Sequence, residues 1–398
     1  MKGGVRKRGN SWYYYFDLAP INGKRNKVER KAEGARTKAE ALRILRHAIT
    51  EYENTGRLFE PSKISVADYL EFWLKEYVEL NLSYNTWDNY RQVIRTHINP
   101  AMGKIRLSSL SPDFLQKFIN DKHRAGFARQ TLTIFHSLLN NALRQAVYPY
   151  RLIMENPMQY VKLPRSERKK TTRQDLKIIT LNQVQEILNF IGKDNSFYIP
   201  FQIGFHTGMR RGEVCALEWD RVDLKNGVIE VDQAMTREGK DWVIGPPKSS
   251  SSFRKFKIGP TLINILKEHK LRQKKNKIRY GEHYRKNKLL YRTSRYDKFV
   301  KEGDFVCTKE NGEVVTPNSI KWSCSNIKNK LGIDFGFHSL RHTHATLLLE
   351  RGAPIKDVQK KLGHARASIT IDTYLHLTEK MQDETLDIFE NIADQLEH

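Results

Sequence analysis

The chain has 398 residues, of which 69 are Lys or Arg and 45 are Asp or Glu, so its formal net charge at pH 7 is +24. A basic excess of this size predicts a polyanionic partner, most simply nucleic acid, although an anionic membrane surface would also attract it. No apolar run approaches the roughly 18 residues of a spanning helix, and three cysteines without metal-like spacing favour a reducing cytoplasm over a disulfide framework or a zinc site.

Residues 1–63 are predicted to form a small sheet backed by one helix. The aromatic run over 12–18 is typical of a strand, and a turn at Asn22-Gly23 leads to a second, basic strand over 25–31. A capping-box pattern then predicts a helix over about 37–56. These elements suffice for a separate small module.

Alternation along the aromatic strand separates two sets of side chains. Because successive side chains of a strand point to opposite faces, one set is expected to pack on the helix and the other to face outward. The outward set and nearby basic residues are a candidate DNA-binding surface, since a small β-ribbon fits the major groove. Alternatively, its tyrosines are ordinary exposed strand residues. The predicted core set is Trp12, Tyr14, Phe16 and Leu18, and the candidate DNA contacts are Tyr13, Tyr15, Lys24, Arg25 and Lys27.

Residues 64–163 are predicted to form a four-helix module without strands. Ser111-Pro112 is a clear helix start, with proline at the first helical position. Thr86 and Tyr90, at the second predicted helix, are further candidate DNA contacts. The polar, basic stretch 164–175 lacks periodicity and is typical of an interdomain linker, which can also follow a phosphate backbone.

The remainder of the chain, 176–398, is predicted to be one mainly helical α+β domain. Its basic stretch 271–295 contains interleaved tyrosines and is either a solvated helix and loop or a DNA-facing surface. Its C-terminal part, 378–396, reads as an acidic amphipathic helix. Helices are predicted to begin at Thr180 and to span 196–218, and strands are predicted near 228–233, 242–244 and 255–258.

Six residues spread over this domain form an unusual chemical set. Arginine supplies fixed charge and planar donors suited to a phosphate, histidine exchanges protons near neutral pH, and tyrosine is a possible oxygen nucleophile. Together they indicate phosphoryl transfer through a covalent phosphotyrosine, with no metal ion or other cofactor required. The set is Arg210, Lys248, His338, Arg341, His364 and Tyr374.

Five motifs, in order along the chain, carry a resemblance to the tyrosine recombinase (phage-type integrase) family. They match the patterns TGxRxxE, PKxxxSxR, HxLRH, LGH and TY. The front of the chain is similar to the arm-binding and core-binding modules of integrases from conjugative transposons and temperate phages, so the resemblance covers essentially the whole sequence. The motifs are Thr207–Glu213, Pro247–Arg254, His338–His342, Leu362–His364 and Thr373-Tyr374.

The resemblance implies a multidomain α+β fold. An arm-type DNA-binding domain is expected over 1–63, a helical core-binding (SAM-like) domain over 64–163, and a basic linker over 164–175. The catalytic domain, 176–398, is expected to be mainly α-helical with a small antiparallel sheet, the tyrosine recombinase catalytic fold. The implied activity is site-specific DNA recombination that integrates and excises a mobile element.

The chemistry of a phosphodiester gives the two arginines and the tyrosine their roles. Attack on phosphorus passes through a pentacoordinate state with extra charge on the nonbridging oxygens, which Arg210 and Arg341 can clamp. Tyr374 would attack through its phenolic oxygen. At the ordinary pKa of about 10, only about one tyrosine in a thousand is ionised near pH 7, so it needs an assisting base or the arginine field.

The resemblance completes the set with proton transfers. The family assigns to His338 the assistance of proton loss from the tyrosine, and to Lys248 the donation of a proton to the leaving 5′-hydroxyl. His364 is expected to hydrogen-bond the scissile phosphate. The phosphotyrosine ester conserves the bond energy, so a second 5′-hydroxyl can reverse the step without ATP.

Four neighbouring residues are expected to support the site. Glu213 is predicted to be an ion-pair brace, and Arg254, counted among the DNA-contacting candidates, is predicted to position the turn that carries the lysine. His342 and His344 resemble metal ligands when read with His338, but no fitting carboxylate or cysteine joins them, so a structural role is expected.

The resemblance also implies partners. Four protomers are expected to act on two double-stranded DNA attachment sites, with a small excisionase-type accessory protein controlling direction. The helix over 378–396 either caps its own domain or docks on a neighbouring protomer. Two other functions stay open at this point: a type IB topoisomerase-like enzyme that relaxes DNA, and a non-catalytic DNA-binding regulator.

Overall fold

The computed structural model describes residues 3–55, 62–165, 177–247, 250–294 and 297–363. The chain divides into two compact units, 1–167 and 168–398, and this boundary lies inside the predicted linker. The finer division of the first unit at residue 63 stays a prediction. No helix in the described stretches is both long and apolar enough to cross a membrane.

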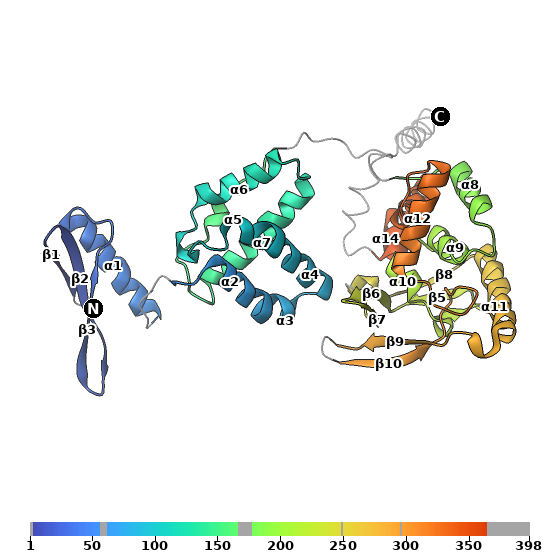
Figure 1. The fold of residues 1–398 in the computed structure, drawn as a ribbon, viewed down its shortest axis with the longest axis horizontal. Coiled ribbons are helices and arrows are strands. Elements are labelled where there is room, and N and C mark those ends of the chain that lie inside the picture. The colour runs from blue at the N-terminus through green and yellow to red at the C-terminus, as the bar shows by residue number, and fades with distance from the viewer. Residues whose placement is uncertain (1–2, 56–61, 166–176, 248–249, 295–296, 364–398) are drawn as a thin grey trace, which may run out of the picture. The chain divides into compact units, whose positions relative to one another are not determined.

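The N-terminal module is a three-stranded antiparallel sheet with one helix along a face (Figure 1). Its elements are β1 (Gly3–Arg8), β2 (Ser11–Ile21), β3 (Lys24–Lys31) and α1 (Lys38–Thr55). Tyr14 and Phe16 are buried and belong to the core that α1 covers, which confirms the predicted core face. The predicted capping box is also confirmed, since Thr37 and Glu40 each donate a backbone N–H to the other's side chain at 3.1–3.2 Å. Strand β1, a basic stretch with two glycines, is not predicted from the sequence.

Residues 62–165 form four long helical stretches without strands, as predicted. Their elements are α2 (Val66–Trp73) with α3 (Glu79–Asn81), α4 (Tyr84–Val93) with α5 (Asn99–Met102), α6 (Pro112–Arg124) and α7 (Arg129–Val147). Two π-helical turns, Leu74–Val78 and Ile94–Ile98, join α2 to α3 and α4 to α5. Tyr69 and Trp73 are fully buried in the core of this module.

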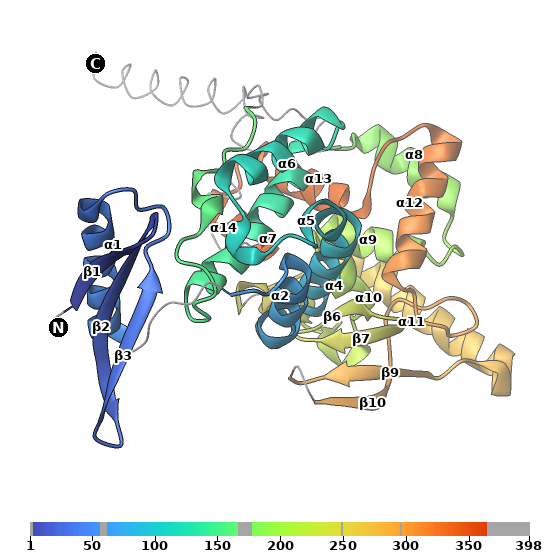
Figure 2. The same cartoon turned by 60° about the vertical axis from the view of Figure 1, so that its left-hand side comes forward.

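The described part of the second unit is mainly helical and contains two small sheets, the larger of which is labelled in Figure 2. Its helices are α8 (Leu181–Ile191), α9 (Tyr198–Thr207), α10 (Arg211–Cys215), α11 (Pro260–Tyr280), α12 (Pro317–Leu331), α13 (Phe337–Leu349) and α14 (Ile355–Leu362). Its strands are β4 (Val222–Asp223), β5 (Val228–Val231), β6 (Ala234–Glu238), β7 (Asp241–Gly245), β8 (Arg254–Lys257), β9 (Asn287–Arg292) and β10 (Lys298–Gly303). The expected small sheet is thus split into β10-β9-β7-β6 and β4-β5-β8, and β7 pairs with β9 in parallel.

Strands β9 and β10 form a hairpin that the sequence does not predict. Part of it falls in the basic stretch 271–295, whose lysines suggest an exposed surface. Two buried carboxylates attach the hairpin to the domain: Glu218 accepts the Tyr291 hydroxyl at 2.9 Å, and Glu238 accepts Arg292 at 2.5 Å and Lys298 at 2.6 Å. These partners are distant in sequence, so no local pattern reveals them.

A close approach of α9 and α13 positions the functional residues. A Cβ atom on Gly204 of α9 would lie 2.7 Å from the Phe337 ring and 3.0 Å from Leu340, so only glycine permits this spacing. The Thr343 hydroxyl of α13 accepts the Ile179 N–H at 3.1 Å, which fixes the start of the domain to the same helix. The end of α9 therefore lies beside the turn of α13 that carries the predicted catalytic pair.

Candidate active site

The helix predicted over 196–218 is interrupted, and the interruption places Arg210. Helix α9 ends at Thr207, Gly208 adopts a left-handed φ of 67°, and Arg210 is the N-cap of α10. The Thr207 hydroxyl accepts the Met209 N–H at 3.2 Å and helps to close the turn. The prediction of one continuous helix is wrong because a glycine at this position ends the helix in the left-handed conformation.

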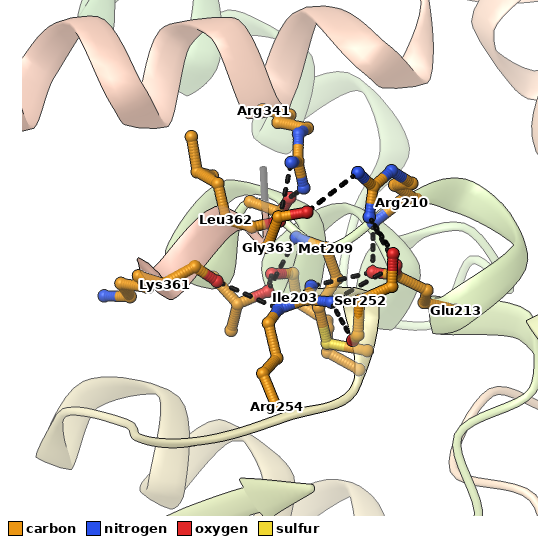
Figure 3. A network of polar contacts seen from close by, with 12 residues as sticks. Ile203, Met209, Arg210, Glu213, Ser252, Arg254, Arg341, Lys361, Leu362 and Gly363 are labelled. Atoms are coloured by element: carbon orange, nitrogen blue, oxygen red, sulfur yellow. Dashed lines mark hydrogen bonds and ion pairs between the residues drawn. The ribbon is translucent and has the colours of Figure 1, made fainter. Parts of the chain in front are cut away.

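Arg210 lies at the centre of a polar network that joins three elements (Figure 3). Its Nη1 donates to the Glu213 carboxylate at 2.9 Å and to the Ser252 hydroxyl at 3.3 Å, while its Nη2 donates to the Gly363 carbonyl at 3.3 Å. These partners belong to α10, to the turn before β8, and to the end of α14. The side chain is 36% exposed, so part of it is open to solvent.

Arg341, from α13, is almost completely buried, with 1% of its surface exposed. Its Nη1 donates to the Gly208 carbonyl at 2.9 Å and its Nη2 to the Leu362 carbonyl at 2.6 Å. Leu362 and Gly363 are consecutive, so the two arginines hold neighbouring carbonyls at one turn, as Figure 3 shows. Two fixed positive charges thus converge in one small region, which suits a doubly clamped phosphate.

A buried ion pair lies beneath the two arginines. The Glu213 carboxylate accepts both terminal nitrogens of Arg254, at 3.2 and 2.7 Å, as well as the Arg210 side chain. Burial raises the pKa of Glu213, but the hydrogen bond and charge of Arg254 and the contacts of Arg210 outweigh it, so the pKa lies below its usual value. The predicted ion-pair brace is therefore confirmed.

Arg254 connects this brace to the last helix of the site. Its Nε donates to the Lys361 carbonyl at 2.9 Å and its Nη1 to the Ser252 carbonyl at 3.0 Å. The side chain is only 5% exposed. This burial favours the predicted positioning role over a direct DNA contact.

His338 and His342 stand one turn apart on α13, with ring centroids 4.7 Å apart. Solvent reaches the His338 side chain. Even so, the surrounding protein atoms, and then the nearby charges of His342, Arg341 and Arg210, lower its pKa to about 4. Burial likewise lowers the pKa of His342 to about 4. Both imidazoles are therefore neutral near pH 7, and a neutral imidazole can accept a proton.

His344 is buried and packs into the same helix pair. Its Nδ1 lies 2.9 Å from the Phe205 carbonyl, and because a carbonyl only accepts, Nδ1 carries the proton. Contacts of this kind agree with the structural role predicted for it. Within the described ranges, no three His, Cys, Asp or Glu side chains gather closely enough to hold a metal ion.

The second unit, 168–398, is expected to lose stability as the pH falls from about 6.5 toward 4. Four of its histidines have folded-state pKa values of about 4, against an ordinary value of 6.5, so between these limits the unfolded chain binds protons that the folded chain does not. Stability is therefore complete above pH 6.5 and declines on acidification. The four are His269, His338, His342 and His344.

Thermal melts of the full chain between pH 7.5 and pH 4.5 check this expectation. His269→Gln, at a site that is 5% exposed, should flatten the dependence of Tm on pH. His283→Gln, at an exposed position, is the control and should leave the slope unchanged. A Tm that stays constant from pH 7 to pH 5 would contradict the expectation.

Gly208→Ala is expected to lower both stability and activity. Its left-handed φ costs an L-residue about 1–2 kcal/mol, and the new Cβ would lie 2.6 Å from the Leu362 side chain. That crowding displaces the turn whose carbonyls hold the arginines. Gly332→Ala is the matched control, because its φ is 69° and no heavy atom lies within 4 Å of the new Cβ.

Both glycine variants should therefore show a lower Tm in thermal melts. At a temperature where both are folded, only Gly208→Ala should cleave DNA substrate more slowly. Equal cleavage rates for the two variants under these conditions would show that the crowding does not reach the arginines.

Half of the predicted catalytic set can be placed. Arg210, Arg341 and His338 lie near one another, since the charges of both arginines lower the pKa of His338. Lys248, His364 and Tyr374 lie outside the described residues. Ser252 was not predicted from the sequence, although it belongs to the PKxxxSxR motif, and neither were the carbonyl partners, because a backbone carbonyl has no sequence signal. Those carbonyls belong to Gly208, Lys361, Leu362 and Gly363.

The candidate DNA contacts of the N-terminal module lie on strands β2 and β3. Lys27 Nζ lies 4.0 Å from the centre of the Tyr15 ring, and Arg25 pairs with Asp17 at 2.9 Å. Tyr13 is flanked by Arg8, which the sequence analysis missed. Lys24 begins β3 and is exposed.

The two candidates in the helical module have roles within it. The Thr86 hydroxyl lies 2.9 Å from the Ser83 hydroxyl at the start of α4. The Tyr90 ring stacks on Trp73 with centroids 5.9 Å apart. Contact with DNA at either position stays a prediction.

Both units of the chain match known protein families. Residues 177–381 match the phage integrase family, and residues 65–123 match the phage integrase N-terminal SAM-like domain. A XerC-like tyrosine recombinase of Caldanaerobacter subterraneus subsp. tengcongensis is 25% identical over 384 residues, which cover 93% of this chain and 94% of the relative. The ICEBs1 integrase of Bacillus subtilis is 23% identical over 396 residues, covering 98% and 99%.

Solved structures show the same fold. The Tn1549 transposon integrase in complex with a circular intermediate DNA superposes with a TM-score of 0.63 at 19% identity, covering 82% of this chain and 99% of that one. A lambda integrase tetramer bound to a Holliday junction gives a TM-score of 0.54 at 16% identity, covering 92% and 94%. The family match spans more than half of the sequence and contains the arginine pair. The chain therefore belongs to the phage integrase family and is a tyrosine recombinase.

Proposed function

We propose that this recombinase cleaves and rejoins DNA at specific sites through a covalent 3′-phosphotyrosine on Tyr374, and so integrates and excises a mobile element. The observation that carries the proposal is the convergence of Arg210 and Arg341 on one turn, beside the neutral His338. Two guanidinium groups fixed by a buried carboxylate and by backbone carbonyls form a preorganised site for a phosphodiester.

In the proposed cleavage step, the Tyr374 oxygen attacks phosphorus and the bond from phosphorus to the 5′-oxygen breaks. His338 accepts the phenolic proton, for which its low pKa keeps it available. Lys248 gives a proton to the 5′-oxygen as it leaves, and His364 hydrogen-bonds the phosphate. Arg210 and Arg341 stabilise the charge that develops on the nonbridging oxygens.

Rejoining follows the same path in reverse. The 5′-hydroxyl of a second strand attacks the phosphotyrosine, and the tyrosine leaves with its proton restored. The number of phosphoester bonds is conserved, so the reaction needs no ATP. In this scheme the arginines also carry out the charge stabilisation that a metal ion would otherwise provide.

We propose a division of DNA contacts among four parts of the chain. Residues 1–63 bind arm-type sites, 64–163 bind the core site, the linker 164–175 follows the backbone, and 176–398 carry out the chemistry. The net charge of +24 supports contact along the whole chain. Such an enzyme acts where the chromosome lies, in the bacterial cytoplasm.

We further propose that four protomers act together on two duplexes. The lambda integrase, which shares the fold, is a tetramer when bound to a Holliday junction. The acidic segment 378–396 would dock on its own or a neighbouring protomer, and a small excisionase-type protein would set the direction.

A nicked suicide substrate tests the proposed function. The full chain is incubated with DNA fragments of the element ends, and a denaturing gel should reveal protein covalently joined to a 3′ end. Sequencing the DNA at the adduct should identify one defined site. Absence of any adduct overturns the proposal, and adducts at arbitrary sequences with supercoil relaxation point instead to a topoisomerase-like enzyme.

A further inference from the structure

The outer face of the N-terminal sheet, opposite α1, mixes basic, aromatic and acidic side chains. The strand register shows which side chains share this face, because residues paired across antiparallel strands point to the same side. Arg6 pairs with Tyr13, Gly4 with Tyr15, and Tyr15 with Glu29. We call this surface the outer face. Its members are Arg6, Arg8, Tyr13, Tyr15, Asp17, Arg25, Lys27, Glu29 and Lys31.

The Tyr15 ring lies at the middle of the outer face. A Cβ on Gly4 would lie 2.6 Å from the Tyr15 hydroxyl and 2.8 Å from the adjoining ring carbon, so the end of the ring lies across the glycine. Lys27 Nζ stands 4.0 Å from the ring centre and the Arg6 guanidinium 5.8 Å. A major groove accepts a two-stranded β-ribbon, and the cations of the outer face suit its phosphates.

A carboxylate, that of Glu29, lies beside Tyr15 within this cationic surface. Glu29 pairs with Arg6 through two hydrogen bonds, from Nε at 2.5 Å and from Nη2, and Arg8 Nη2 lies 3.4 Å from the same carboxylate. The Glu29 side chain remains 24% exposed. The Arg6 hydrogen bond holds the pKa of Glu29 below its usual value, so the group is ionised and can only accept hydrogen bonds.

The pairing leaves a defined set of groups for a ligand. Arg6 uses Nε and one edge of Nη2 on the carboxylate, and its Nη1–Nη2 end points away from that contact with two parallel N–H groups. Glu29 offers its remaining lone pairs beside them. A donor fork and an acceptor therefore stand next to each other on the outer face.

We propose that Arg6 and Glu29 together read a guanine and a cytosine, with Arg6 donating to guanine O6 and N7 and Glu29 accepting the cytosine N4 amino group. The proposal rests on the proposed function of this module, that its outer face enters a major groove. In that groove a carboxylate meets a favourable partner only at an amino group, and cytosine presents one without a neighbouring ring acceptor. A carboxylate also repels phosphates, so it contributes specificity and not general affinity.

The second ion pair on the outer face, Asp17 with Arg25, differs from the Arg6–Glu29 pair in its exposure and its position. Asp17 and Arg25 are 43% and 71% exposed, and the pair lies toward the β2–β3 turn. Glu29 is less exposed and is contacted by two arginines next to the central tyrosine. The central position favours a base contact for Glu29, and Asp17 serves to hold Arg25.

Selection of DNA from a random pool, using the full chain and deep sequencing, tests the proposal. The motif read by the outer face is defined as the one that Tyr15→Ala loses. In wild type this motif should contain a cytosine that Glu29→Gln no longer selects, with discrimination at that position falling by about 5- to 150-fold. Because glutamine pairs with adenine N6 and N7, the preferred base should change from cytosine to adenine.

Glu33→Gln, which removes the same charge at an exposed position beyond β3, is the control and should leave the motif unchanged. If Glu29→Gln keeps the cytosine and changes affinity equally for all sequences, Glu29 is only a brace for Arg6 and the proposal fails. If Tyr15→Ala loses no motif, the proposed arm-binding function of the outer face fails first. The two failures are therefore distinguishable.

Discussion

Replacing Tyr374 by phenylalanine is expected to abolish strand cleavage while leaving DNA affinity nearly unchanged. The change removes one oxygen atom, which is the proposed nucleophile, and leaves the charge and most of the side-chain volume in place. The two arginines and the basic surfaces that attract DNA are unaffected. Without the nucleophile no alternative bond to phosphorus can form, so we expect the cleavage rate to fall by at least about 10³-fold.

Two measurements on the same preparation check this expectation. A suicide substrate should give no covalent adduct on a denaturing gel, and a mobility-shift titration should give a Kd close to that of wild type. Tyr291→Phe is a useful comparison, since it removes a phenolic oxygen from a buried tyrosine that hydrogen-bonds Glu218. A covalent complex that persists in Tyr374→Phe would sink the assignment of the nucleophile.

The prediction of Tyr374 as the nucleophile rests on residue types and on their order along the chain. The same holds for the core face of the aromatic strand, where period-two alternation separated Tyr14 and Phe16 from Tyr13 and Tyr15. Local hydrogen bonding likewise encodes the Thr37–Glu40 capping box. For the strand and the capping box, the pattern that predicts the structure lies within a few residues.

Features that depend on long-range contacts could not be predicted. The β9–β10 hairpin is attached by Glu218 and Glu238, whose partners follow more than 50 residues later. The contact of the Gly208 carbonyl with Arg341, on a distant helix, likewise has no local signal in the sequence. The outer face was partly anticipated, but β1 with Arg6 was missed, because two glycines in a basic run are typical of a flexible tail.

The arrangement around Arg210 explains why the family motifs occur as separated pieces. Glu213 comes from the first motif and Arg254 from the second, and the carbonyls that Arg210 and Arg254 bind belong to Gly363 of the fourth motif and to Lys361 just before it. The first, second and fourth motifs thus each supply part of one polar network, which holds the arginines in place. A rigid guanidinium loses no further entropy when it meets the developing charge of the transition state.

Arg341→Lys is expected to reduce strand cleavage by about 10²–10³-fold, although the positive charge is retained. The guanidinium holds two carbonyls, those of Gly208 and Leu362, through separate nitrogens. A lysine has one nitrogen and cannot hold both carbonyls and present a parallel pair of donors to phosphate. One buried carbonyl left without its donor costs about 1–3 kcal/mol, so Tm should also fall.

Single-turnover cleavage at a temperature where the variant is folded separates the two effects. Arg351→Lys, at an exposed position just after α13, is the matched control and should leave both Tm and rate unchanged. DNA affinity should change little in Arg341→Lys, because the positive charge is kept. If cleavage proceeds at the wild-type rate in the folded variant, the two-nitrogen geometry of Arg341 has no part in catalysis, and its role is confined to holding the ends of α9 and α14 together.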